Sequence, residues 1–230
     1  MAALALLWPV LAGAAHAADT PAKAPALCTV PTSGYGSYLL PDSGRYTGQF
    51  RDGLFHGHGK IQWGDGDRYE GEFRKGLMHG RGVLRSRDGS VLKGHFANGR
   101  PDGEGVYTTE DFTFRGHYRN GRYQGLGRVE FTDGRVYEGH FDQGQWQGSG
   151  RLEDPDHFVY EGDFVKGRME GRGRIDWSNG DWYEGRFAGD WPDGEGACEI
   201  DGDIGVCQYD HGDLQDLLRA NDAKPDMTTS

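Results

Sequence analysis

Apolar and polar residues alternate in short stretches along most of the chain. Residues 69–73 read Tyr-Glu-Gly-Glu-Phe, so a strand would place Tyr69, Gly71 and Phe73 on one face and both glutamates on the other. Residues 57–63 alternate in the same way, with glycine, isoleucine and tryptophan on one side. The pattern predicts β-strands with one aromatic and glycine-rich face and one polar face.

This pattern is repeated at a fixed interval, which is the first feature to settle in any sequence. A segment of the form Tyr-x-Gly-x-Phe, or a close variant, occurs seven times at steps of 23 residues, with one step of 22. Each copy is followed by a Gly-x-Gly pair, so each repeat holds two strands. The copies begin at Tyr46, Tyr69, Leu92, Phe114, Tyr137, Tyr160 and Tyr183, and the glycine pairs begin at Gly57, Gly80, Gly103, Gly125, Gly148, Gly171 and Gly194.

Half-copies flank the seven repeats. Residues 34–38 lie at the spacing from Tyr46 that Gly57 has from Tyr69, and they are predicted to form the second strand of an incomplete first unit. Residues 207–212 align with the start of a repeat and are predicted to form the first strand of an incomplete last unit.

The chain therefore divides into an array and its flanks. The array covers residues 34–213, with the seven full repeats over 46–205, and residues 18–33 form an N-terminal extension. Leu214, Leu217 and Leu218 have helical spacing, so residues 214–230 are predicted to form a short capping helix and a disordered tail.

These motifs resemble the MORN repeat, whose pattern is Tyr-x-Gly-x-Phe, a turn, Gly-x-Gly and an Asp-Gly turn. The resemblance covers roughly residues 34–213. It implies an all-β fold, an elongated, twisted, single-layer antiparallel sheet of tandem β-hairpin repeats, and a role in interaction or scaffolding. Physical reasoning agrees, because glycines beneath the rings would let aromatic side chains lie flat over bare backbone. Glycines of Asp65-Gly66, Asp133-Gly134 and Asn179-Gly180 are expected to supply positive φ in the turns between units.

The first residues predict export. Residues 2–15 are apolar but too short for a membrane-spanning helix, and Ala15-His16-Ala17 matches a cleavage site. Residues 1–17 are thus expected to be a signal peptide, although no Lys or Arg precedes the apolar run, so either the start lies upstream or the α-amino group serves instead. The protein is expected to be periplasmic or secreted.

Composition narrows the choice of fold and partner. Glycine accounts for 40 of 230 residues and aromatic residues for 12%, while a mean hydropathy of -0.76 leaves too little apolar material for a large round core. A fold in which each unit touches only its neighbours fits better. The net charge of -11 excludes nucleic acid as a partner. It disfavours association with a membrane without excluding it.

The aromatic stripe is the strongest candidate binding feature. Its rings would either form the core of the single layer or line an exposed groove for a peptide, helix or glycan, rimmed by residues near the turns such as Phe55, Met78, Tyr123 and Met169. The candidate partner-binding residues are Tyr46, Trp63, Tyr69, Phe131, Tyr137, Trp146, Tyr160, Trp177 and Tyr183.

No catalytic residue, metal site or cofactor is predicted. The chain lacks a Gly-x-Ser-x-Gly motif, and its carboxylates repeat with the hairpins. The repeated histidines, His95, His117 and His140, would lie about 10 Å apart, too far to share a metal. The acidic segment 153–157 is read as a loop variant, with a recognition spot as the alternative.

The cysteines predict a disulfide bond. If Gly202 and Asp203 form a two-residue turn, Cys198 stands directly opposite Cys207, with Cα atoms about 4.5 Å apart. In an oxidising compartment these two cysteines are expected to be bonded. Cys28 is either free or cross-links two chains.

Three functions are compatible with these features. The first is a non-catalytic exported scaffold that binds a protein partner, or itself, through the aromatic face or edge strands. The second is a cell-envelope protein that binds glycan or lipid head groups. The third, an enzyme, is disfavoured because no site irregularity supports it.

Overall fold

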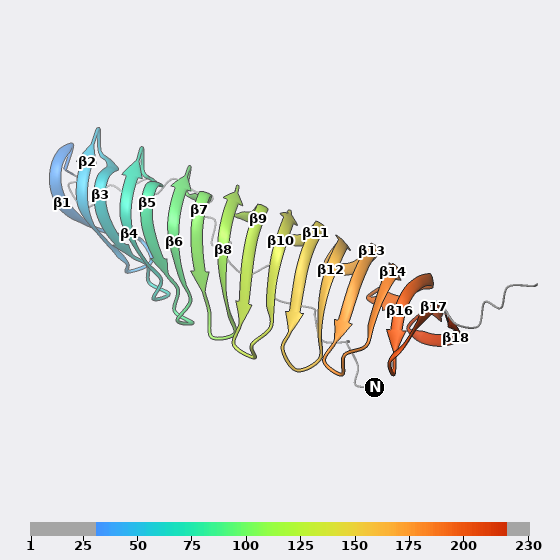
Figure 1. The fold of residues 1–230 in the computed structure, drawn as a ribbon. Helices are drawn as coiled ribbons and strands as arrows, with labels where there is room; N and C mark the ends of the chain where they lie inside the picture. Colours follow the sequence, from blue (N-terminus) through green and yellow to red (C-terminus); the bar gives the residue numbers. More distant parts are fainter. Residues whose placement is uncertain (1–30, 220–230) are drawn as a thin grey trace, which may run out of the picture. The chain divides into compact units, whose positions relative to one another are not determined.

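The computed structural model describes residues 31–219, which form two compact units, 31–132 and 133–219. The predicted signal peptide, most of the N-terminal extension and the predicted disordered tail lie outside the described residues. Every element of the described part is a β-strand (Figure 1). Within residues 31–219 there is no helix long and apolar enough to cross a membrane.

The first unit is an open antiparallel sheet in which each strand pairs with the next along the chain. Its strands are β1 (Ser33–Leu39), β2 (Arg45–Arg51), β3 (Leu54–Gln62), β4 (Arg68–Arg74), β5 (Leu77–Arg85), β6 (Val91–Ala97), β7 (Arg100–Thr108), β8 (Phe112–Arg119) and β9 (Arg122–Phe131).

The second unit is built in the same way. The short β15 and the longer β16 both pair with β14, so they act as one strand interrupted at Asp193. The strands are β10 (Val136–Asp142), β11 (Gln145–Asp154), β12 (Phe158–Val165), β13 (Arg168–Trp177), β14 (Trp182–Ala188), β15 (Trp191–Pro192), β16 (Gly194–Ile200), β17 (Asp203–Asp210) and β18 (Asp213–Arg219). The predicted all-β fold of antiparallel hairpin repeats is confirmed.

Two kinds of turn join the strands. Inside a repeat, two residues with positive φ form the turn, for example Asn120 at 51° and Gly121 at 83°. This geometry is the tight hairpin turn that suits the right-handed twist of the strands. Between repeats the turns are longer, and Gly66, Gly134 and Gly180 have φ of 105°, 93° and 97°, as predicted.

The two ends of the array differ from each other. Gly36 of β1 pairs with Gly48 of β2, which is the register predicted for the second strand of an incomplete unit. At the other end the predicted capping helix is wrong, because Asp213–Arg219 is a strand. The turn at His211 and Gly212, both with positive φ, returns the chain antiparallel to β17, and this backbone pairing overrides the helical spacing of the leucines.

The core depends on pairs of glycines that face each other across neighbouring strands. Gly48 pairs with Gly59, and the ring of Tyr46 lies over both. A Cβ atom at Gly59 would stand 2.4 to 2.6 Å from three ring and hydroxyl atoms of Tyr46. Only a residue without a side chain can occupy that place. Equivalent glycine platforms lie under Tyr69, Tyr137, Tyr160 and Tyr183.

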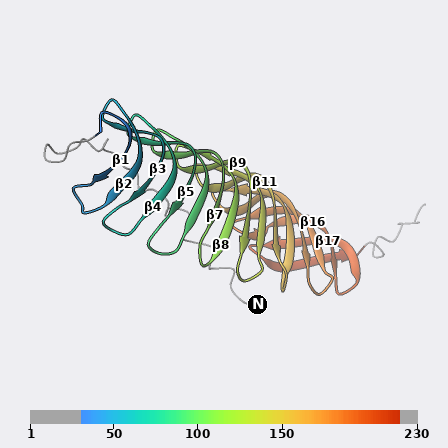
Figure 2. The ribbon, with the colours of Figure 1, turned by 90° about the vertical axis from the view of Figure 1, so that its left-hand side faces the viewer.

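A bulge beside each platform offers a hydrogen-bond partner to the hydroxyl of a tyrosine at the ring position. Gly48 pairs with Gly59, but the next pair joins Gln49 to His56, so the second strand carries two extra residues. The tyrosine hydroxyl donates to the carbonyl at the bulge, as from Tyr46 Oη to Gln49 O at 2.8 Å. Bulges bend strands, and the strands of each sheet are curved along their length (Figure 2). The same bond recurs at Tyr69, Tyr137, Tyr160 and Tyr183.

Replacing a platform glycine by alanine is expected to destabilise the protein strongly. In Gly150→Ala the new Cβ would lie 2.6 to 2.9 Å from atoms of the Tyr137 ring, so unfolding should become easier by about 2 kcal/mol or more. The measurement is urea unfolding followed by tryptophan fluorescence. The control is Ser149→Ala, one residue away on the opposite face and exposed, with an expected change within about 0.5 kcal/mol. Equal effects of the two variants would contradict the platform.

Candidate interaction surfaces

The aromatic face is a closed core. The ring of Tyr137 lies between its glycine platform and Trp146, which stacks on it with centroids 4.0 Å apart. Phe141 of the same strand and Phe164 of the next repeat meet the ring edge-on at 5.3 and 5.1 Å. Each ring is thus enclosed by its own repeat and by the following one.

The prediction that these rings line a binding face is therefore wrong for six of the nine residues. Tyr46, Tyr69, Tyr137, Tyr160 and Tyr183 are 0 to 1% exposed and Trp146 is 5% exposed. The proposed rim residues Phe55, Met78, Tyr123 and Met169 are buried as well, because they cover the rings. The physical reason is that the next repeat supplies the missing layer. Trp63, Phe131 and Trp177 lie at strand ends and are half-buried.

Burial also fixes the chemistry of the core hydroxyls. It raises the pKa of Tyr46 to about 12 and raises the pKa of Tyr69, Tyr137 and Tyr160 further. These hydroxyls are therefore protonated at neutral pH and serve as donors to the bulge carbonyls. They are not placed to exchange protons with a substrate.

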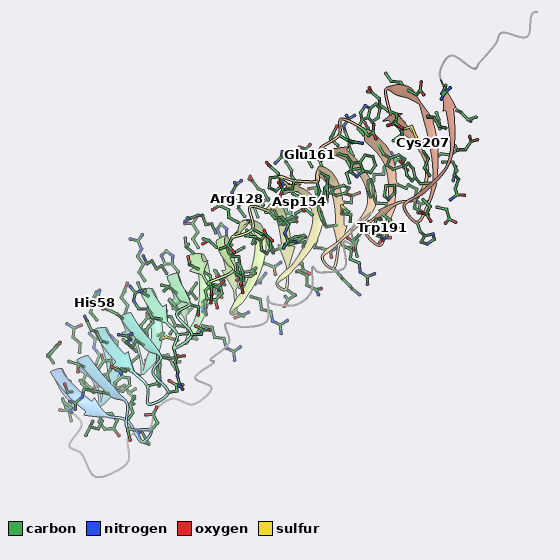
Figure 3. The ribbon with its side chains drawn as sticks, turned by 90° about the horizontal axis from the view of Figure 1, so that it is seen from below. His58, Arg128, Asp154, Glu161, Trp191 and Cys207 are labelled. Atoms are coloured by element: carbon green, nitrogen blue, oxygen red, sulfur yellow. A yellow bond between two sulfur atoms is a disulfide. The ribbon has the colours of Figure 1, made fainter. Side chains whose placement is uncertain are left out.

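The outer face carries exposed, mainly charged side chains. In the second unit Glu138, Arg151, Glu161, Arg174 and Glu184 follow one another across adjacent strands. Arg151 Nε lies 3.0 Å from Glu161 Oε1 (labelled in Figure 3), and Arg174 reaches Glu184 at 3.6 Å. Exposed pairs of this kind contribute little to stability, so the face is available for other contacts.

The comparison with protein families agrees with this architecture. The sequence model of the MORN-repeat family matches residues 46–68, 69–91, 93–113, 114–134, 137–158, 160–182 and 183–200. The chain belongs to the MORN-repeat family. No curated protein sequence matches the chain.

Several solved structures resemble the chain at low identity and with TM-scores below 0.5. The SAS-4 TCP domain of Drosophila melanogaster, in complex with a proline-rich motif of Ana2, is 12% identical with a TM-score of 0.42, over 82% of this chain and 96% of that one. The G-box domain of the microcephaly protein CPAP is 16% identical with a TM-score of 0.46, over 79% and 97%. The TCP10 domain of Danio rerio CPAP, with a STIL peptide, is 17% identical with a TM-score of 0.40, over 81% and 100%. At these values the likeness says nothing about what the MORN array binds.

The repeated histidines have different partners in each MORN repeat. His95 contacts Arg81, His117 lies 3.7 Å from Glu104, and His140 contacts the carbonyl of Ser149. These contacts place them on the solvated face. In the acidic segment, His157 contacts Asp154 at 2.8 Å, which raises the pKa of the histidine and ties the loop to its own strand.

One cluster escaped the sequence analysis because the turns, not the motifs, bring it together. Within residues 31–219 only Asp193, Asp210 and His211 could share a metal ion, with ligand atoms within 4.8 Å of one another. His211 Nδ1 already contacts Asp210 Oδ1 at 2.6 Å, and this contact raises the histidine pKa. Asp210 and His211 thus form an exposed ion pair beside a turn, and the half-buried Asp193 lies 3.9 Å from the same histidine nitrogen.

The predicted disulfide is present in the structure, but the predicted register was wrong. Cys198 pairs with Gly205 and Cys207 with Gly196, because the turn is formed by Asp201 and Gly202. The two cysteines are therefore diagonal neighbours with Cα atoms 5.9 Å apart. Both are fully buried in the last hairpins of the array, where Cys207 is labelled in Figure 3. Gly205 stands in the tyrosine row, so the bond occupies space that a ring fills elsewhere.

Loss of this bond is expected to loosen the C-terminal end. The bridge closes a loop of sequence separation 9, so the paired variant Cys198→Ala, Cys207→Ala should be less stable by about 2.5 kcal/mol. The measurement is urea unfolding, with Cys28→Ser as the control that removes the third thiol. Non-reducing peptide mapping of the mature protein should show the 198–207 link. Two alkylatable thiols at these positions would contradict the assignment.

Proposed function

We propose that this MORN-repeat protein is a non-catalytic, exported scaffold that binds a protein partner through the outer face of its sheets. The observation that carries the proposal is the contrast between the two faces within one chain. The second platform glycine is the same in all seven repeats, and the ring position is tyrosine in five of them. The outer-face positions vary more, since the residue after the ring position is glutamate in four repeats and threonine, lysine or arginine in the others.

The clearest case is the middle residue of each Gly-x-Gly pair, which is exposed in every repeat. Folding places no demand on this side chain, yet the repeats carry basic, acidic, hydroxyl, imidazole and aliphatic groups there. Such a surface is typical of repeat proteins that use a uniform core to present a varied contact surface. The residues are His58, Arg81, Glu104, Leu126, Ser149, Arg172 and Glu195.

The alternative of a glycan or lipid head-group binder is less well supported. That function would use exposed tyrosine and tryptophan rings, whereas the five platform tyrosines and Trp146 are enclosed. A protein surface, by contrast, is readily bound by charged and hydrogen-bonding side chains of the kind found on the outer face.

Export is supported by two separate features. Residues 2–15 and the Ala15-His16-Ala17 sequence have the form of a signal peptide. The disulfide at the C-terminal end is of the kind that persists in oxidising compartments. Intact-mass measurement of the protein from producing cells tests this part, because the mature chain should begin at Ala18.

Site-specific photo-cross-linking in the native cells tests the binding surface. A benzophenone amino acid at Ser149 or Arg172, both on the outer face, should give one common cross-linked protein. The control position is Lys166, which is exposed in a turn of the same unit and should give little of that product. An equal yield from the turn, or no product from the outer face, would contradict the proposal.

A further inference from the structure

The last hairpin breaks the charge pattern of the outer face. The row of alternating charges that includes Arg174 and Glu184 continues with Ala197, Val206 and Leu218, which pair directly across β16, β17 and β18. All three are exposed, Val206 at 44% and Leu218 at 63%. An apolar row therefore stands in water where the preceding repeats of this unit place ion pairs.

One neighbouring residue enlarges this apolar row. Ile204, two residues before Val206 on the same face, is 57% exposed. Leu214, which is 41% exposed, pairs with the buried Tyr209 and therefore lies on the opposite face. Of the ten exposed large apolar residues in the described part of the chain, three lie together on this face, Ile204, Val206 and Leu218. Exposed apolar groups gathered in this way mark contact sites.

The backbone at this end is also open to a partner. Within residues 31–219, β18 pairs with β17 and with no other strand. In the preceding repeat the corresponding strand, the interrupted β15 and β16, pairs on both sides, with β14 and β17. An edge of this kind is a template for one more strand.

The negative charge of the C-terminal end of the array favours a basic binding partner. Residues 190–219 contain nine Asp and Glu residues and one Arg, and residues 133–219 contain 21 acidic and 8 basic residues. A second copy meeting this end with its own acidic end would be repelled, whereas a basic segment would be attracted. The acidic residues nearest the open edge are Asp213 and Asp216, both exposed on β18.

We propose that β18 accepts an extended, basic segment of a partner protein, which adds to the sheet as a further strand. Its backbone pairs with the open edge of β18, its apolar side chains pack against Leu218 and Val206, and its Lys or Arg residues face Asp213 and Asp216. This inference deepens the proposed function, since it names one site and the chemistry of the segment that occupies it.

Binding of synthetic peptides to the full chain tests the site. The probe is a blocked peptide of alternating valine with lysine or arginine, and its comparison is the same peptide with glutamate in place of the basic residues. The basic peptide should bind and shift the amide NMR signals of β18, and added salt should weaken it. A version with methylated backbone amides on the edge-facing side should not bind, because it cannot donate to the strand.

Paired variants locate the contact. Val206→Thr with Leu218→Thr keeps two strand-forming residues and removes apolar surface, so binding of the basic peptide should weaken about tenfold. Asp216→Asn should also weaken binding and should reduce its salt dependence. The matched control is Val83→Thr with Val106→Thr on the outer face of the first unit, which should leave binding unchanged.

Three results would overturn this inference. The first is equal binding of the acidic peptide, and the second is unchanged binding after the Val206 and Leu218 substitutions. The third is a dimer in sedimentation that those substitutions dissociate, because the occupant would then be a second copy of the chain. If outer-face cross-links to a partner form while the basic peptide fails to bind β18, this inference fails and the proposed function stands. If the peptide binds as expected but the cross-links are absent, the edge is the binding site and the outer-face proposal fails.

Discussion

The contact between a tyrosine ring and two facing glycines determines the rest of this structure. The ring lies flat on backbone from two strands, which is feasible only where neither residue has a Cβ atom. It thereby joins the two strands of one repeat, while the edge-on phenylalanine of the following repeat joins it to its neighbour, as Phe73 does for Tyr46. A sheet that is only one layer thick obtains a dry core because successive repeats cover one another's rings.

The constraint concerns the space above the glycines more than the identity of the ring. In the repeat that carries Leu92 in place of tyrosine, the ring of Tyr118 comes to within 2.9 Å of the Cβ position of Gly105. In the last repeat Gly205 replaces the ring, and the Cys198–Cys207 bond is buried beside it. The core thus tolerates substitutions that fill the volume, and it leaves the outer face free to vary between repeats. This freedom links the fold to the proposed binding function.

Much of this fold could be predicted from the sequence. The 23-residue repeat locates the strands, and the alternation of residues within each strand indicates which face of the sheet a side chain occupies. Strand alternation identified Tyr69, Gly71 and Phe73 as one face, and the glycine spacing identified the platform. Burial of the rings was not decided by the same pattern, since alternation shows which face a ring occupies and not what covers it. The strand at 213–219 was missed because three leucines at helical spacing outweighed a turn, His211-Gly212, whose first residue gives no sign of positive φ. The predicted pairing of Cys198 opposite Cys207 was wrong for a similar reason, because the turn was predicted at residues 202 and 203 and lies at 201 and 202.

The most direct test of this account is residue-resolved nitration of the folded protein, read by mass spectrometry. Tyr35, which is 75% exposed, should be modified readily, whereas Tyr46, Tyr69, Tyr137, Tyr160 and Tyr183, at 0 to 1% exposure, should stay unmodified until the protein is unfolded. Modification of the five platform tyrosines at the rate of Tyr35 in the folded chain would contradict the account, because the aromatic face would then be an open surface rather than the core.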